Sequence, residues 1–287
     1  MLRSLFPLEG SLLMQGPIFQ VLALVTHGNA ALSGRPAAGF YPSHAAFAFT
    51  EYVRFARLEP PREAWRTTPL AADPGLWLAK LRDGGCRGLR AWRSASADED
   101  TVADRFSVAF VGGGGRWLIE SVGPAGSDFW MANWRLGNRD RPHRKIWQVT
   151  YGRVEQDRPT AAPEPASLDR LSRDLQETLR EAVALSRRND LEEFTPSFEA
   201  ALAALTAEGE PDLHGLAPPG QLPLPASRLL GASLHAWVFG GMGSWNDIVL
   251  RGSDDEDYHR VSENLYRLIN AAAVEAVNCS YGAAGRS

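Results

Sequence analysis

The spacing of apolar residues changes partway along this chain of 287 residues, and that change constrains the fold more than any other feature. In the first half, apolar side chains recur at every second position, which is typical of strands half buried in a sheet. From residue 167 they recur about every 3.6 residues, which is typical of amphipathic helices. The sequence therefore predicts an α+β fold, with an antiparallel β-rich region over residues 1–154 and a mainly helical region over residues 167–287.

Residues 155–166 separate the two patterns, and their proline and alanine content predicts a linker. A proline-rich segment can also cross the face of a single domain. Two domains, or one sheet with helices packed on one side, therefore both stay open, and the alternating βα pattern of a doubly wound fold is absent.

The first region contains six segments with a strand pattern, and these are residues 18–26, 47–55, 106–111, 116–122, 129–136 and 146–154. Four glycines, Gly112 to Gly115, separate the third segment from the fourth and predict a hairpin. A polar loop joins the last two segments into a second hairpin. Residues 76–81 favour a short helix.

The second region carries four helix patterns. Ser167 is placed to cap the first, and Thr195, followed by Pro196, is placed to cap the second. Pro225 opens the third, and the fourth covers residues 255–278.

Composition excludes some classes of protein. Hydrophobic residues make up 44% and charged residues 22%, as in ordinary globular proteins. The formal net charge of -4 gives no global field that would steer the chain to nucleic acid or acidic lipid. Of the thirty basic residues only Lys80 and Lys145 are lysines, a bias that fits a GC-rich bacterial genome.

Cysteine is sparse, because only Cys86 and Cys279 occur, in dissimilar contexts. They give no disulfide framework and no thiolate metal site, so we expect a cytoplasmic protein. Glycines, prolines and polar residues interrupt the apolar N-terminal stretch, and we predict neither an export signal nor a membrane span. Met1 and Met14 are both plausible starts.

The glycine-rich loop at residues 240–247 is the first candidate for a site. It combines glycines, which allow close approach to a partner, with hydrogen-bonding side chains around an aromatic one. The predicted ligand-binding residues are Ser244, Trp245, Asn246, Asp247 and the nearby His235. In the competing interpretation the tryptophan fills the core and its polar neighbours form a turn.

Acidic residues at 254–257 and His259 follow the loop. A carboxylate beside an imidazole can serve acid–base chemistry, but four acids at a helix start also complement the helix dipole. No metal-ligand spacing is present, so we predict no metal. His27 follows the first predicted strand and His44 precedes the next, so turns at these positions would bring the two histidines together at one sheet edge. A turn role for Gly28 and Asn29 is the favoured interpretation.

The second hairpin, residues 130–151, combines basic and aromatic residues. The candidate interaction surface comprises Trp134, Arg139, Arg141, Arg144 and Lys145. Arginine and tryptophan favour protein interfaces, and the same pair of chemistries serves single-stranded nucleic acid.

We therefore expect a ligand- or protein-binding module without catalysis and without a cofactor. One alternative is a hydrolase with a pocket at residues 240–247. A second alternative is nucleic-acid binding through the hairpin, which the acidic net charge makes the weaker interpretation. The sequence leaves the ligand or protein partner and the oligomeric state open.

Overall fold

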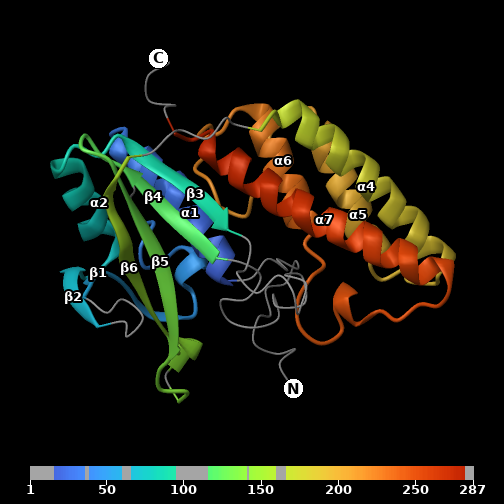
Figure 1. Cartoon of the computed structure of the whole chain (residues 1–287), viewed down its shortest axis with the longest axis horizontal. Coiled ribbons are helices and arrows are strands. Elements are labelled where there is room, and N and C mark those ends of the chain that lie inside the picture. The colour runs from blue at the N-terminus through green and yellow to red at the C-terminus, as the bar shows by residue number, and fades with distance from the viewer. Residues whose placement is uncertain are drawn as a thin grey trace.

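The computed structural model describes residues 16–35, 39–59, 66–94, 116–140, 142–159 and 166–281. Within these ranges the chain forms one six-stranded sheet, mostly in the N-terminal half, and six α-helices, mostly in the C-terminal half (Figure 1). The predicted α+β fold is confirmed.

The sheet has the strand order β2-β1-β6-β5-β4-β3. Its strands are β1 (Thr50–Leu58), β2 (Thr67–Ala71), β3 (Gly88–Ser94), β4 (Arg116–Val122), β5 (Ser127–Leu136) and β6 (Trp147–Arg158). Adjacent strands are antiparallel with one exception, since β1 and β6 run parallel. The predicted antiparallel, β-rich region is therefore confirmed, and the sheet is mixed only through the parallel pair of β1 and β6. Alternation along a strand shows only which face is buried and cannot reveal this pairing.

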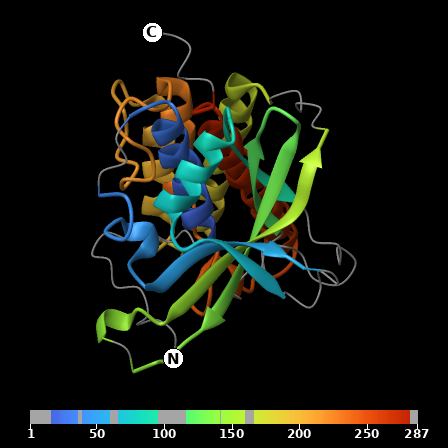
Figure 2. The ribbon, with the colours of Figure 1, turned by 90° about the vertical axis from the view of Figure 1, so that its left-hand side faces the viewer.

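The helices lie in two groups. They are α1 (Gly16–Leu32), α2 (Pro74–Asp83), α4 (Leu168–Arg188), α5 (Thr195–Thr206), α6 (Leu224–His235) and α7 (Ser253–Asn278). Helices α1 and α2 lie on one face of the sheet, and α4 to α7 pack on one another beside the β3 edge (Figures 1 and 2). One continuous hydrophobic cluster contains residues of the sheet and of both groups, so the two predicted regions share a core.

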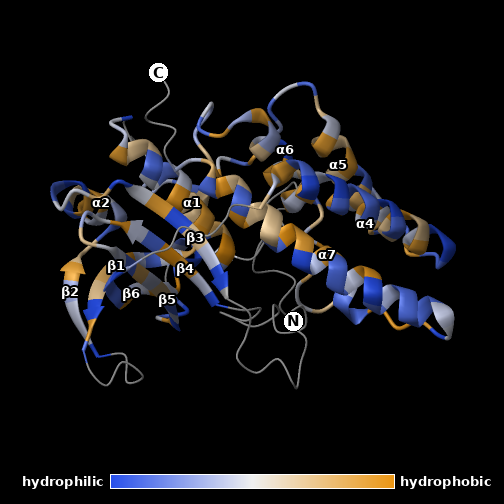
Figure 3. Ribbon diagram, turned by 45° about the horizontal axis from the view of Figure 1, so that its top comes forward, coloured by the Kyte–Doolittle hydropathy of each residue, from blue (hydrophilic) through white to orange (hydrophobic). Residues whose placement is uncertain are grey.

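The strand predicted over residues 18–26 is wrong, because these residues belong to α1. Every residue from Ile18 to Thr26 is buried, and much of the α1 ribbon is hydrophobic where that of α4 is mixed (Figure 3). A helix that is apolar on all sides shows no 3.6-residue period, so the pattern cannot distinguish it from a buried strand. Gly28 and Asn29, expected in a turn, also lie in this helix.

The other strand predictions have mixed outcomes. The strands near residues 47–55 and 116–122, the hairpin of β5 and β6, and the short helix at 76–81 are confirmed as β1, β4, β5, β6 and α2. Residues 106–111 and the four glycines after them lie outside the described residues. Among the described strands β4 pairs with β5 and with β3, and the sequence pattern missed β3.

The helix boundaries depend on local capping. Ser167 caps α4 through a hydrogen bond that its side chain accepts from Arg170 N, as predicted. Thr195 does not cap α5, because the helix already includes it and its hydroxyl shares a 2.8 Å hydrogen bond with Ser186. Pro225 lies in the first turn of α6, as expected. The first four residues of the predicted linker complete β6.

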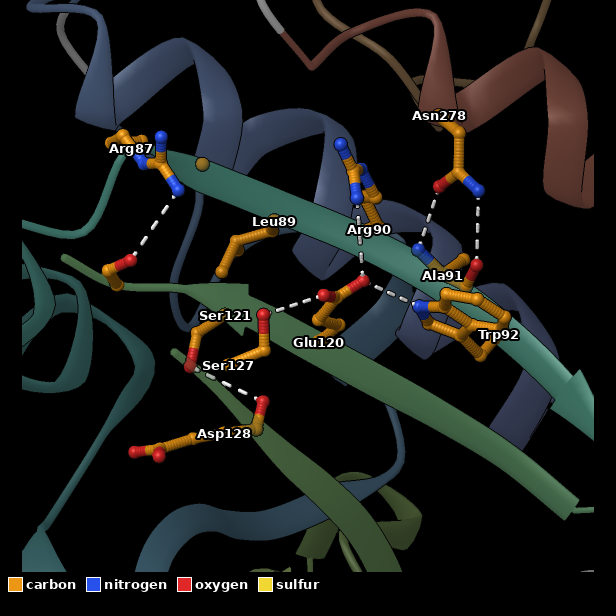
Figure 4. A network of polar contacts seen from close by, with 12 residues as sticks. Arg87, Leu89, Arg90, Ala91, Trp92, Glu120, Ser121, Ser127, Asp128 and Asn278 are labelled. Carbon is orange, nitrogen blue, oxygen red and sulfur yellow. Dashed lines mark hydrogen bonds and ion pairs between the residues drawn. The ribbon is translucent and has the colours of Figure 1, made fainter. Parts of the chain in front are cut away.

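The outer edge of β3 is paired with two asparagine side chains. Asn29 of α1 accepts from Leu89 N at 2.6 Å and donates to Leu89 O at 2.9 Å. Asn278 of α7 accepts from Ala91 N at 2.7 Å and donates to Ala91 O at 3.0 Å (Figure 4). Each amide thus satisfies the backbone groups of one edge residue as a neighbouring strand would.

Close packing of α1 on β3 depends on Gly28. A Cβ atom at this position would lie 2.4 Å from Cδ1 of Leu89. The glycine therefore brings the helix backbone near enough for Asn29 to reach the strand. In the part of the chain that the structure describes, no helix has the length and apolar character to cross a membrane.

Candidate functional site

The open face of the sheet, opposite α1 and α2, carries a cavity of about 620 Å³. No described helix lies against this face (Figures 1 and 2). Among the described residues, the apolar part of the cavity lining consists of Trp92, Leu118, Phe129, Met131, Val154 and Pro159. Leu118 pairs with Trp92 on one side and with Met131 on the other. Cross-strand partners share a face, so the three side chains form one apolar row across β3, β4 and β5.

Glu120 holds Trp92, one of the residues that line this cavity, in place. Its side chain is 0% exposed, yet both carboxylate oxygens have donors. Oε2 accepts from the indole N–H of Trp92 at 2.6 Å, and Oε1 accepts from Ser127 Oγ at 2.6 Å (Figure 4). Arg90 Nη1 lies 3.8 Å from Oε2. A buried carboxylate is tolerated when it is hydrogen-bonded and near a cation, and here it also fixes the Trp92 ring.

The described residues around the cavity carry mostly positive charge. They include Arg93, Arg116 and Arg158 and one acid, Glu155. Arg116 begins β4, whereas Arg158 pairs with Ser127 near the opposite end of that strand. Arg116 and Arg158 therefore lie on either side of the apolar row, toward the two ends of β4.

A second polar cluster joins α1 to the loop after α5. His27 and His44 both direct Nε2 at the carbonyl oxygen of Gly215, at 2.9 and 2.8 Å. Their ring centroids are 4.9 Å apart, and Phe40 stacks on His27 at 4.2 Å. The two histidines do meet, but through a helix and a loop rather than through two strands.

The hydrogen bonds favour the neutral form of these imidazoles. A carbonyl oxygen can accept two hydrogen bonds, so each Nε2 is the protonated nitrogen. Nδ1 of His44 accepts from Ala46 N at 3.1 Å and has no room for a proton of its own. Burial lowers the pKa of His27 to about 4, assisted by His44, and burial also lowers the pKa of His44. While both imidazoles are uncharged, His27 and His44 hold the loop at Gly215 through these hydrogen bonds.

The glycine-rich loop is filled by its own residues. Trp245 is 0% exposed, and Phe194 and Phe198 contact its ring with centroids at 5.1 Å. Its indole N–H donates to Ser262 Oγ at 2.7 Å, and its carbonyl accepts from Tyr258 OH at 2.6 Å. This tryptophan packs in the core.

The polar residues of the loop serve its backbone. Asp247 accepts from Gly243 N, and the Ser244 hydroxyl accepts from Asn246 N at 3.3 Å. The geometry fits the turn interpretation, and the predicted ligand role of these residues draws no support from it.

The other residues considered for a hydrolase site are His235, His259 and the acids at 254–257, and each contacts a different set of neighbours. His235 is half buried, and burial, together with the nearby His214, lowers its pKa. His259 lies 3.7 Å from Asp255, one helical turn away in α7. Arg188 bridges the acids Asp254 and Asp257 at 2.7 and 2.6 Å. The acidic start of α7 thus joins α4 to α7, and the hydrolase alternative stays an untested prediction.

The basic hairpin projects from the body at the tip of β5 and β6 (Figures 1 and 2). Arg139 and Arg144 are exposed there, and Lys145 is partly buried. Arg141 lies outside the described residues. Trp134 is half buried against Trp147 at 6.2 Å, edge to face, so its ring packs within the hairpin rather than standing out from it.

Among the described residues, no group of three or more histidine, cysteine or acidic side chains could hold a metal ion. The chain matches no protein-family model, no curated protein and no solved structure.

Sequence reasoning missed the residues of the sheet cavity. The available signal was the alternation in β4, where Trp117, Ile119 and Ser121 face one side and Leu118 and Glu120 the other. An acid among apolar residues of a strand indicates either solvent or a specific buried partner.

Proposed function

We propose that this chain is a bacterial, cytoplasmic binding module that holds a small ligand in the sheet cavity and catalyses no reaction. The cavity itself carries the proposal. Its volume of about 620 Å³ lies within the range of roughly 300–1,000 Å³ that small-molecule sites occupy. An apolar lining with a few polar groups is the usual composition of such sites.

The fixed position of Trp92 supports this proposal. Its indole N–H is bound by Glu120, and its ring contacts Phe129 edge to face with centroids 6.1 Å apart. A wall that is already ordered loses little entropy when a ligand binds. The cytoplasmic location is proposed because the two cysteines form no disulfide framework, and the bacterial origin because arginine so strongly outnumbers lysine.

A thermal-shift screen against metabolites tests the proposal when it is run on three proteins. Met131→Trp places a bulkier ring among the residues that line the cavity, and Asn133→Trp adds the same ring two residues further along β5, outside the cavity lining. A ligand present at about 100 times its dissociation constant stabilises the folded state by about 2.7 kcal/mol. We expect hits that stabilise the wild type and Asn133→Trp but not Met131→Trp. Hits that stabilise all three equally would contradict this site.

Nucleic-acid binding by the hairpin is the second candidate. The exposed arginines at a projecting tip favour it. Its test is a salt titration with a single-stranded oligonucleotide, because phosphate contacts make affinity fall steeply with salt. Binding that is absent or insensitive to salt would remove this candidate.

A further inference from the structure

We infer that the ligand of the sheet cavity is an apolar molecule that carries an anionic group, such as a carboxylate, sulfonate or phosphate ester. This inference rests on the proposed function and adds the chemistry of the ligand. It combines two observations, namely the apolar row across three strands and the two arginines, Arg116 and Arg158, on either side of it.

The apolar row defines the body of the ligand. Trp92, Leu118 and Met131 lie side by side on one face of β3, β4 and β5. Phe129 contacts the Trp92 ring and extends the row along β5. A flat or extended hydrocarbon fits such a surface, because burial of apolar area is the available driving force.

The arginines define the charge. Within the described ranges, the charged residues that line the cavity are Arg93, Arg116, Arg158 and one acid, Glu155. Arg93 pairs with Trp117, whose face of the sheet is opposite the apolar row, and its guanidinium lies over the ring of Tyr266 at 5.2 Å. The cationic groups beside the apolar row are therefore Arg116 and Arg158. The guanidinium fork matches carboxylate, sulfonate and phosphate oxygens, and its attraction is stronger beside an apolar surface than in water.

The buried acid does not oppose this charge. Glu120 is absent from the cavity lining, and its oxygens accept from Trp92 and Ser127 with Arg90 nearby. Its negative charge is therefore compensated within the sheet.

The test uses a matched pair of fluorescent dyes on the full chain. One is 8-anilinonaphthalene-1-sulfonate, and the other is N-phenyl-1-naphthylamine, which has the same rings without the sulfonate. We expect the folded protein to bind the sulfonate at least about tenfold more tightly, a difference of ~1.4 kcal/mol. The double variant Arg116→Met/Arg158→Met keeps apolar stems at both positions and should abolish that preference. Arg135→Met, on β5 outside the cavity lining, should preserve it.

The outcomes separate the ligand class from the site. Equal binding of both dyes to the wild type, with both lost in Met131→Trp, would overturn the anionic class and leave the cavity as a binding site. A sulfonate preference that survives the double arginine variant would also overturn the inference. If Met131→Trp binds both dyes as the wild type does, or if neither dye binds the wild type, the proposed function fails with it.

Discussion

The glycine-rich loop and the open face of the sheet each contain a tryptophan, and the two side chains differ in how completely other residues surround them. In the loop, aromatic rings surround Trp245 and its indole N–H reaches a buried serine of α7. On the sheet, Glu120 binds the N–H of Trp92 from within, and the ring borders a cavity. Both regions have residues typical of binding sites. Unfilled volume beside such residues, rather than the identity of the residues, therefore distinguishes a binding site from a packed turn.

Removing the filled tryptophan should produce the largest effect. Trp245→Ala leaves a large cavity among Phe194, Phe198 and Tyr258 and deletes a buried hydrogen bond. We expect a loss of about 3–5 kcal/mol in the free energy of unfolding, measured by urea denaturation. The protein that remains folded should bind the anionic dye as the wild type does. A loss of dye affinity in folded Trp245→Ala would show that the glycine-rich loop is part of the binding site.

Truncating Glu120 should affect stability and binding together. Glu120→Ala leaves the Trp92 N–H and the Ser127 hydroxyl without their acceptor, which costs roughly 1–3 kcal/mol for each buried group that stays unsatisfied. The loosened Trp92 ring should also weaken dye binding. Ser127→Ala is the matched control, because it removes one donor to Glu120 and leaves the contact to Trp92 in place. Equal dye affinity in both variants would show that the orientation of Trp92 does not matter.

Acid should loosen the histidine cluster. Burial lowers the pKa of His27 to about 4 in the folded chain, against 6.5 for a histidine in water. The unfolded chain therefore binds more protons between these values, so the stabilising contribution is present above about pH 6.5 and is lost as pH falls toward 4. Allowing for solvent screening of a half-buried group, the loss should be on the order of 1 kcal/mol.

The measurement is urea denaturation of the wild type and of His27→Gln at several pH values. His27→Gln should flatten the acid side of the curve while keeping a side chain that can donate to Gly215. Parallel curves for the two proteins would assign the acid sensitivity to other groups.

Charge removal at the hairpin tip should produce the smallest effect. Arg139 is exposed, so Arg139→Ala should change stability by less than about 0.5 kcal/mol and leave dye binding unaltered. If the hairpin binds single-stranded nucleic acid, the same substitution should reduce the salt dependence of that binding by about one phosphate contact. Reduced dye affinity in this variant would show that the binding site extends to the hairpin tip.

The helical half and the second hairpin could be predicted because their residues carry an amphipathic period. Leu171, Leu175 and Leu179 of α4 are buried at helical spacing, and Ser167 marks the start of that helix. In β6, Val149 and Tyr151 are buried in alternation with half-buried neighbours. Both periods reflect one buried face, which is the quantity that a sequence pattern reports.

The candidate site could not be predicted because it depends on pairings distant in the chain. Trp92 meets Glu120 across strands that are separated by residues outside the described ranges, and the sequence contains no sign of that pairing. His27 and His44 share a carbonyl of Gly215, more than 170 residues away from each. Helix α1 was missed for a different reason, since burial on every side removes the period.

Asn29 and Asn278 belong to α1 and α7, so the protection of the β3 edge from solvent depends on whether these helices stay docked. The amide protons of Leu89 and Ala91 end on Asn29 and Asn278, so they should exchange with solvent when α1 or α7 undocks, even while the rest of the sheet stays paired. These two protons would therefore report separately on each helix. When both helices leave, the strand presents an open edge that can recruit a second chain. Local opening at the helix–sheet junction and the first step of aggregation would then be the same event.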